Sequence, residues 1–449
     1  MKKSNRIFNA ALAFFVLSFA FAGAGCASSP KKEDDAYYRE NLKDFSEYKL
    51  KNEIPVIVKK SNGGQVLVLR AVFEGGTPLI EKSKGGIEGL TLDLMFHGSE
   101  NYSYEDIQNM QYNISFTMND SSGRDYSVAG IKCLQKDFDS VLAVFADCIL
   151  NPVFSEEDFS QFMLNANSNL TSTLADPSGQ LSVELEKAAF AGTAYEASAD
   201  ITEESVKSIA LSDVKNHHEK LLDSARMKFI VVANLDENAQ KNLVSLLDSY
   251  FGNIKKGEYK APVVSKISVQ GENIELHNEQ AGSAGYSIGW FDCPERYDAD
   301  YVPFALSLMY LDDIFFSDVR EKAGAVYSVG TGVLGGKQML GAISAYKISD
   351  LENIHALIRK AIEDFPDEKG IDAKLEQYKN KYITTLFDSS QNAAGVAANI
   401  ITSLEYSGKP DTYLKRSAEV QQTTAAQIES AFKKYIAGEN KIRWITVSR

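Results

Sequence analysis

Apolar residues recur along the chain with two different periods, and these periods predict the elements of the fold. Short apolar runs at Ile54–Val58, Val66–Leu69 and Met227–Ala233 are typical of buried β-strands. Phe138–Leu150 and Glu156–Leu174 instead place apolar residues at helical spacing. The pattern therefore predicts a mixed fold of strands and amphipathic helices.

Turn signals place further elements between these runs. Ser61–Gly64 carries two glycines, so we expect the strands on either side of it to pair as a hairpin. Lys255–Ile267 is polar, contains glycine and proline, and predicts a linker. Strands are also expected at Ile114–Met118 and Tyr126–Ile131, and helices at Tyr104–Tyr112 and Asp213–Leu222.

Gly85–Ser99 is the stretch around which the rest of the chain is organised. Its glycine pair leads into a helical pattern that ends at His97-Gly98-Ser99. Gly89, Leu92 and Asp93 share one side of that helix, at the spacing of an H-x-x-E-H zinc helix. The segment has the frame of such a helix without its imidazoles or its carboxylate base.

The second half of the chain repeats the first at an offset of about 212 residues. Asp137–Val141 corresponds to Asp350–Ile354, and Phe229–Val232 corresponds to Ile442–Val447. We expect two homologous α+β domains that face each other across a cleft, each a mostly antiparallel sheet with helices packed on one face.

Charge and length exclude some functions. The 449 residues carry a formal net charge of −14, which disfavours nucleic-acid binding. Beyond the N-terminal signal described below, no segment is apolar for long enough to cross a bilayer. Cys133, Cys148 and Cys293 match no zinc pattern, and their odd number fits no disulfide framework. We expect buried thiols, with a Cys133–Cys148 bridge as the alternative.

The N-terminus predicts export. A basic start precedes an apolar run and small residues that lead to Cys26, as in a signal peptide. The end of this signal resembles that of bacterial lipoproteins, which implies lipidation of Cys26 and attachment to the periplasmic or cell-surface face of a bacterial membrane. The alternative is ordinary cleavage after Ala24. The predicted boundaries are a signal peptide at 1–25, a polar tether at 26–46, domains at 47–256 and 273–449, and a linker at 257–272.

Three stretches together resemble the insulinase (pitrilysin) family of zinc peptidases, in the two-domain subgroup that includes mitochondrial processing peptidase subunits. They are the helix at Gly85–Ser99, the strand region at Met118–Asp125 and the segment Val319–Val329. The last is close to the second-domain signature Arg-Glu-Lys-x-Gly-Leu-Ala-Tyr-Ser-Val.

The resemblance implies a degenerate zinc site. The two zinc histidines of the family fall on Gly89 and Asp93, the catalytic glutamate on Leu92, and the third ligand on Asn169. We therefore expect no zinc and no catalytic residue on this chain, because a catalytic zinc needs about three protein ligands and a water molecule.

The resemblance also implies retained substrate contacts. Arg320 and Tyr327 match the family's second-domain pair that reaches the substrate main chain, and Asn119 lies on the strand that offers an edge to an extended peptide. The predicted function is a non-catalytic, peptide-binding subunit that supplies these contacts to a homologous zinc-bearing partner. The alternative is an exported peptide-binding or scaffolding lipoprotein without a peptidase role.

Overall fold

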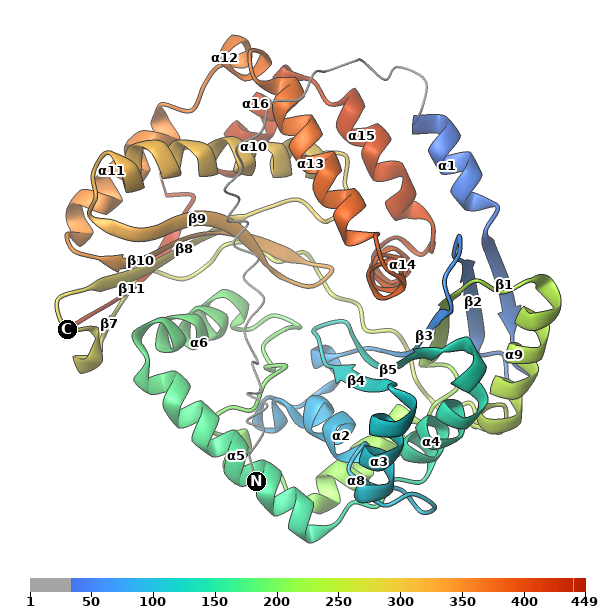
Figure 1. Ribbon diagram of the computed structural model, residues 1–449. Coiled ribbons are helices and arrows are strands. Elements are labelled where there is room, and N and C mark those ends of the chain that lie inside the picture. Colours follow the sequence, from blue (N-terminus) through green and yellow to red (C-terminus); the bar gives the residue numbers. More distant parts are fainter. Residues whose placement is uncertain (1–33, 439) are drawn as a thin grey trace.

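The computed structural model describes residues 34–438 and 440–449, and it contains one β-sheet in each half (Figure 1). The first sheet has the strand order β1 (Phe45–Lys49), β2 (Pro55–Lys60), β6 (Met227–Ala233), β3 (Val66–Glu74), β5 (Tyr126–Leu134) and β4 (Thr117–Ser121). The second has the order β7 (Ile274–His277), β11 (Arg443–Ser448), β8 (Gly285–Asp292), β10 (Met339–Ile348) and β9 (Val326–Gly335). The predicted α+β class is confirmed.

The two sheets share one topology, apart from the additional edge strand β1. In each sheet the last strand of the half, β6 or β11, runs parallel to an early strand and antiparallel to the next one. The antiparallel pairs β4–β5 and β9–β10 form the far edge of their sheets. This repeated strand order is the structural counterpart of the sequence repeat.

The hairpin predicted around Ser61–Gly64 is wrong. Strands β2 and β3 do not pair, because β6 lies between them and pairs with both. A local pattern cannot reveal a strand that arrives from much later in the chain. The strand predicted to begin at Ile114 also begins later, at Thr117, because α3 continues to Ile114 and ends at Ser115 in a left-handed conformation.

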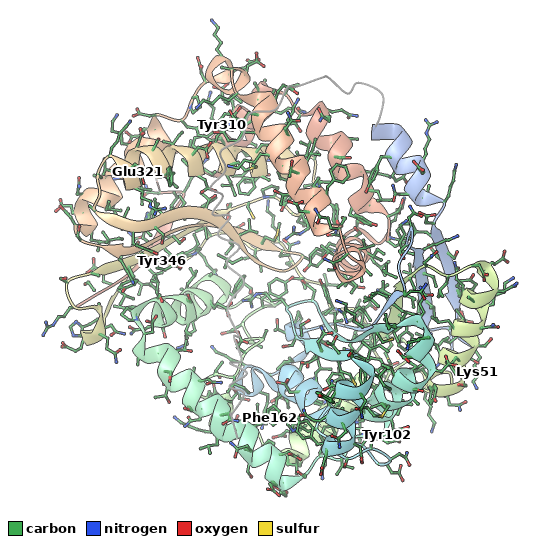
Figure 2. The ribbon with its side chains drawn as sticks, in the orientation of Figure 1. Lys51, Tyr102, Phe162, Tyr310, Glu321 and Tyr346 are labelled. Atoms are coloured by element: carbon green, nitrogen blue, oxygen red, sulfur yellow. The ribbon has the colours of Figure 1, made fainter. Side chains whose placement is uncertain are left out.

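Helices form a layer on the outer face of each sheet. Helix α4 shows the predicted pattern, since its predicted apolar face is fully buried against the first sheet. In the second half, Tyr310 stacks on Tyr378 within the helical layer, with 3.7 Å between ring centroids (Figure 2). The first half contains α1 (Asp34–Leu42), α2 (Ile87–Met95), α3 (Tyr104–Ile114), α4 (Phe138–Leu150), α5 (Glu156–Ala175), α6 (Pro177–Phe190), α7 (Ser205–Ser208), α8 (Leu211–Leu221) and α9 (Glu237–Phe251). The second contains α10 (Tyr301–Ile314), α11 (Leu351–Glu363), α12 (Glu368–Asp372), α13 (Leu375–Ser389), α14 (Ala393–Ser407), α15 (Arg416–Gln422) and α16 (Ala425–Tyr435).

Each half also covers the inner face of the other half's sheet with one helix (Figure 1). Leu181 and Leu185 of α6 share an apolar cluster with Trp290 of the second sheet. Ile400 of α14 shares another with Ile230 of the first sheet. The prediction of helices on one face is therefore incomplete, because the second face is covered by exchange between the halves.

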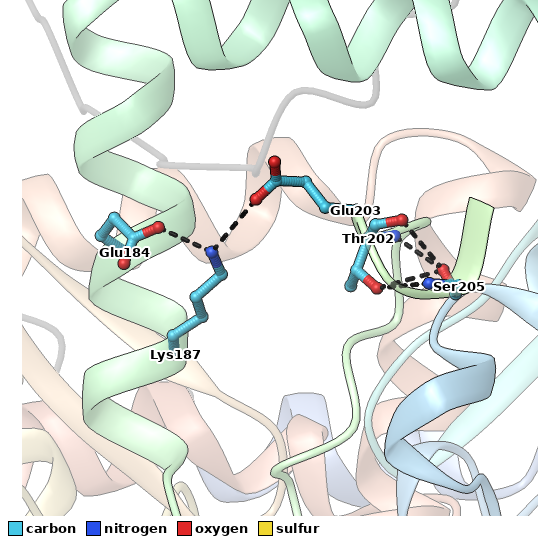
Figure 3. Close-up of polar contacts among 5 residues, drawn as sticks. All are labelled: Glu184, Lys187, Thr202, Glu203 and Ser205. Carbon is cyan, nitrogen blue, oxygen red and sulfur yellow. Dashed lines mark hydrogen bonds and ion pairs between the residues drawn. The ribbon is translucent and has the colours of Figure 1, made fainter. Parts of the chain in front are cut away.

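Helix α6 packs on the sheet of the second half, but it also contacts a loop of its own half. Lys187 of α6 lies 2.6 Å from the Glu184 carboxylate and 3.9 Å from that of Glu203, which belongs to the loop before α7 (Figure 3). These exposed ion pairs contribute little to stability. The Lys187–Glu203 pair nevertheless shows that this loop lies next to α6.

The remaining sequence predictions concern the linker, the cysteines and the N-terminus. No helix or strand lies between α9 and β7, although the predicted domain boundaries stay a prediction. Cys133, Cys148 and Cys293 are buried free thiols, so the alternative Cys133–Cys148 bridge is not formed. The leader and Cys26 lie outside the described residues. None of the described helices is long and apolar enough to span a membrane.

Candidate functional site

Helix α2 begins at a close approach between two backbones. Gly86 has φ 78°, and a Cβ atom there would lie 2.4 Å from the backbone nitrogen of Ile201. Its N–H donates to the Ser198 carbonyl at 3.0 Å. Thr202 and Ser205, which follow in the same loop, exchange side-chain to backbone hydrogen bonds (Figure 3). The glycine pair is needed because this loop covers the start of the helix.

A buried ion-pair network fixes the first turn of α2. The Glu88 carboxylate, 2% exposed, lies 2.6 Å from the Arg226 guanidinium and 3.1 Å from the ring of His217. Burial would raise the pKa of Glu88, but the contacts with His217 and Arg226 outweigh it and lower the pKa to about 2. Glu88 therefore stays ionised and links α2 to α8 and to the start of β6.

The three α2 positions aligned with the family's zinc motif have different surroundings. At Gly89 an added Cβ would lie 2.8 Å from the Ser122 hydroxyl oxygen, so no side chain fits there without a shift. Leu92 is fully buried in the apolar cluster under the first sheet. Asp93 is half-buried beside Asp120 of β4. Only Asp93 presents a polar group.

Asp93 and Asp120 form a carboxyl pair between α2 and the edge strand β4. Burial, together with the Asp120 carboxylate, raises the pKa of Asp93 to about 8. Burial also raises the pKa of Asp120, to about 6. The pair therefore holds at least one proton at neutral pH.

Replacing Asp93 with asparagine is expected to stabilise the protein at alkaline pH. The unfolded chain loses this proton near pH 4, whereas the folded chain keeps it up to about pH 8, so wild-type stability falls as pH rises between these values. In urea unfolding, the stability advantage of Asp93→Asn should grow from pH 4.5 to pH 8.5 and then level off. Exposed Asp139→Asn is the control and should show no such trend. A constant difference for Asp93→Asn across this range would contradict the raised pKa.

These positions do not fit a catalytic zinc ion. Asn169 is exposed on α5 and offers only an amide, while Gly89 and Leu92 offer no donor atom. The carboxyl pair of Asp93 and Asp120 is the only strong donor set there, and zinc sites use about three protein ligands. Nowhere in the described ranges are three or more His, Cys, Asp or Glu side chains grouped to hold a metal.

Strand β4 offers an open edge beside α2. It pairs on one side with β5, and within residues 34–438 and 440–449 no strand pairs with its other side. Asn119 lies on the face of β4 opposite Asp120, and its amide oxygen accepts a hydrogen bond of 2.9 Å from Arg70 of β3. An extended chain could add to this edge through main-chain hydrogen bonds.

Arg320 and Tyr327 are both exposed in the second half. Arg320 lies in a π-helical segment, Phe315–Glu321, and its guanidinium contacts the ring of exposed Phe316 at 5.3 Å. Figure 2 shows the next residue, Glu321, at the left of the second half. Tyr327, at the start of β9, is 67% exposed. Both side chains are thus accessible to a ligand, and π-helical turns recur at functional sites.

Lys347 lies next to Tyr327 and acts electrostatically on Asp176, which follows α5 in the first half. Its ammonium lies 5.4 Å from the centre of the Tyr327 ring. Burial opposes ionisation of Asp176, but hydrogen bonds led by Ser178, with a contribution from Lys347, keep its pKa below the usual value. The charge of Lys347 thus acts on Tyr327 and on the residue that follows α5, the helix that carries Asn169. No hydrogen bond or ion pair of the described residues joins Tyr327 to Asn169 directly.

The two halves meet again next to the open edge of β4. The Asp125 carboxylate accepts hydrogen bonds from the backbone N–H of Lys337 at 2.6 Å and from the Tyr195 hydroxyl. A Cβ atom at Gly336 would collide with Asp125, so glycine permits the tip of β9–β10 to dock there. A cavity of about 200 Å³ lies between this tip, the β4–β5 turn and Tyr406.

Comparisons with known families agree with this architecture. Residues 81–203 match the profile described as "Insulinase (Peptidase family M16)", and residues 208–382 match "Peptidase M16 inactive domain". Together these ranges cover more than half of the chain. This chain belongs to the insulinase family, peptidase M16. It is thus a homologue of M16 peptidases, and its match to the inactive-domain profile spans α8, β6 and α9 of the first half as well as part of the second.

Solved M16-like structures share the fold at low sequence identity. The peptidase M16 inactive domain from Pseudomonas fluorescens has a TM-score of 0.78 and 17% identity, covering 90% of this chain and 97% of its own. A protease from Helicobacter pylori has a TM-score of 0.79 and 14% identity, with coverage of 90% and 99%. The periplasmic protease PqqL from Escherichia coli has a TM-score of 0.76 and 15% identity, covering 96% of this chain and 49% of PqqL. This chain thus spans about half the length of PqqL. A search of curated proteins finds no match.

Sequence reasoning missed the residues that set the electrostatics around α2. Glu88 was visible inside the helix motif, but neither Arg226 nor His217 lies at a spacing that identifies it as a partner. Asp120 was part of a noted strand, but its contact with Asp93 needs the packing of β4 on α2. No sequence pattern identified Arg70 as a partner of Asn119. The alternating pattern of β4 alone could have separated the faces of Asn119 and Asp120.

Proposed function

We propose that this M16 homologue is a non-catalytic, peptide-binding subunit of a peptidase whose zinc is carried by a partner chain. It would bind an extended peptide as an additional strand along the open edge of β4. The observation that carries the proposal is the open edge of β4, which lies beside an α2 helix without zinc ligands. Main-chain pairing at such an edge binds peptides of varied sequence. Polar groups beside it include Asn119, Arg70 and the carboxyl pair.

Arg320 and Tyr327 would contact the substrate main chain from the second half. A guanidinium offers several fixed donors to peptide carbonyls, and a tyrosine hydroxyl can donate to a carbonyl or a developing oxyanion. Both side chains are accessible, and the Arg320 guanidinium has no hydrogen-bond or ion-pair partner among the described residues. The zinc ion and the catalytic base would come from the partner chain, since Gly89 and Leu92 cannot supply them.

The proposed location is outside the cytoplasm, on the membrane face to which Cys26 would be anchored. The leader is the support for this location, together with the resemblance of the fold to PqqL, which is described as a periplasmic protease. Globomycin treatment of the expressing bacterium, followed by membrane fractionation, separates lipidation from ordinary cleavage after Ala24.

Peptide binding should depend on Arg320. With a fluorescently labelled, unstructured peptide and anisotropy as the readout, Arg320→Ala should weaken binding about 10-fold, and Tyr327→Phe a few-fold, because each loses hydrogen bonds to the peptide. Arg359→Ala, exposed on α11 of the same half, is the matched control and should bind as wild type does. Equal affinities for Arg320→Ala and wild type would remove the proposed role of this residue.

The partner is tested by mixing and by metal analysis. The isolated chain should contain no stoichiometric zinc and cleave no peptide, whereas adding a homologous H-x-x-E-H chain should produce cleavage that Arg320→Ala reduces. A chain that binds peptide but never restores activity would instead be a peptide-binding or scaffolding protein. Stoichiometric zinc in the isolated chain would contradict both functions.

A further inference from the structure

A second cavity, of about 110 Å³, is lined mainly by residues of the second half, and none of its lining residues belongs to β4. Helices α1, α10, α13, α14 and α15 and the segment just before α10 surround it. Its polar lining includes Arg296, Tyr297, Tyr301, Tyr382, Arg416 and Ser417. Two guanidinium groups therefore face one small space in a protein whose formal net charge is −14.

Arg296 has no carboxylate partner. One of its terminal nitrogens donates to the Tyr301 hydroxyl at 3.3 Å, while its Nε is buried without any hydrogen-bond partner. No carboxylate of the described residues lies within ion-pair distance of it. The half-buried Arg124 and the buried Arg226 differ in this respect, because each of them pairs directly with a glutamate. A buried charge without a counter-ion is costly.

Arg416 contributes the second guanidinium that lines this cavity. It donates to the backbone carbonyl of Arg296 at 2.6 Å and pairs with Glu419 at 2.9 Å. It also lies 4.9 Å from the centre of the Tyr297 ring. The neighbouring Ser417 hydroxyl is buried and has no hydrogen-bond partner. The cavity thus combines one unpaired positive charge with two unsatisfied polar atoms, Arg296 Nε and Ser417 Oγ.

We propose that this cavity binds a small oxyanion, a carboxylate or a phosphate, through Arg296 and Ser417. The planar fork of an arginine matches both groups, and a hydroxyl can donate a further hydrogen bond to either. The Arg296 guanidinium lines the cavity without a carboxylate partner, and the negative charge of such a ligand would offset this unpaired charge. The tyrosine rings around it provide apolar walls for a small organic anion.

The cavity and the proposed peptide-binding edge are built from different residues. The cavity is lined mainly by second-half helices, whereas the open edge belongs to β4 of the first half. Tyr37 of α1 also lines the cavity and packs edge-on against Phe387 of α13, with 5.4 Å between ring centroids. An anion bound here would therefore stabilise the contact of the N-terminal helix with the second half. Its loss need not impair peptide binding.

Thermal unfolding of the full chain tests the proposal. Inorganic phosphate or acetate replaces chloride at constant ionic strength, and a specific ligand should raise the melting temperature in a saturable way. Arg296→Gln should weaken the affinity at least ~10-fold, since it removes charge-assisted hydrogen bonds. A shift with phosphate alone assigns a phosphate ligand, and a shift with acetate alone assigns a carboxylate.

Two further variants make the result specific. Arg359→Gln, exposed on α11, should keep the full shift, which separates the site from a general effect of the salt. Ser417→Ala should weaken the affinity a few-fold while the chain remains folded, so it tests the site even if Arg296→Gln does not fold. The proposal is overturned if neither anion produces a saturable shift, or if Arg296→Gln and Ser417→Ala both retain the wild-type affinity.

Discussion

Replacing Glu88 with alanine should lower the free energy of unfolding by about 3–5 kcal/mol. The Glu88 carboxylate is the buried counter-ion of Arg226, whose side chain is 3% exposed, and it also contacts His217. Removing it leaves the Arg226 charge buried with only a backbone carbonyl of Glu74 as a partner. Urea denaturation at pH 7 measures the effect.

The matched control is an exposed ion pair on another helix of the same half. Glu237 and Lys241 lie 2.6 Å apart, with side chains 76% and 58% exposed. Glu237→Ala should change the free energy of unfolding by less than about 1 kcal/mol. If Glu88→Ala costs no more than this control, the buried network does not hold α2 in place.

Acid should reproduce part of the Glu88 effect. The folded-state pKa of Glu88, about 2, is below the ordinary value of 4.5, so the stabilisation is complete above pH 4.5 and is lost as pH falls toward 2. The stability difference between wild type and Glu88→Gln should therefore shrink across this window.

Replacing Ile230 with alanine should destabilise both halves of the protein together, by about 2–5 kcal/mol. Ile230 is fully buried on the inner face of the first sheet, in the cluster that α14 of the second half completes. Because α6 makes the reciprocal contact on the second sheet, neither sheet is fully covered by its own half. The whole chain should unfold in one transition.

The two tryptophans make this coupling measurable. Trp290 and Trp444 both lie in the second sheet, so their fluorescence reports on the half that does not contain Ile230. The Ile230→Ala midpoint should shift equally by fluorescence and by far-UV circular dichroism, whereas Val263→Ala, at a residue 91% exposed, should shift neither. A fluorescence midpoint that does not move would mean that the halves unfold independently.

The two proposed ligand sites differ in what they need from the rest of the molecule. The open edge of β4 depends on main-chain groups and on a partner for catalysis, so its function is sensitive to Arg320 and Tyr327. The oxyanion cavity depends on Arg296 within one half. Measurements of peptide affinity and of anion-dependent stability can therefore succeed or fail separately.

The amino-acid sequence by itself determined the repeated α+β architecture and the bounds of several elements of the first half. Helix α4 and strand β6 have the bounds that their apolar patterns predict, because a local period of burial is sufficient to define a single helix or strand. The glycine pair before α2 was also visible as a local signal.

Only the tertiary structure decided which distant segments meet. The insertion of β6 between β2 and β3, the exchange of α6 and α14, and the pairs Glu88–Arg226 and Asp93–Asp120 all join residues without a common local pattern. The position of the unpaired Arg296 guanidinium was equally invisible in the sequence, since the cavity that it lines forms only where five helices pack together. Burial sets the cost of a charge, and burial is a property of the whole fold.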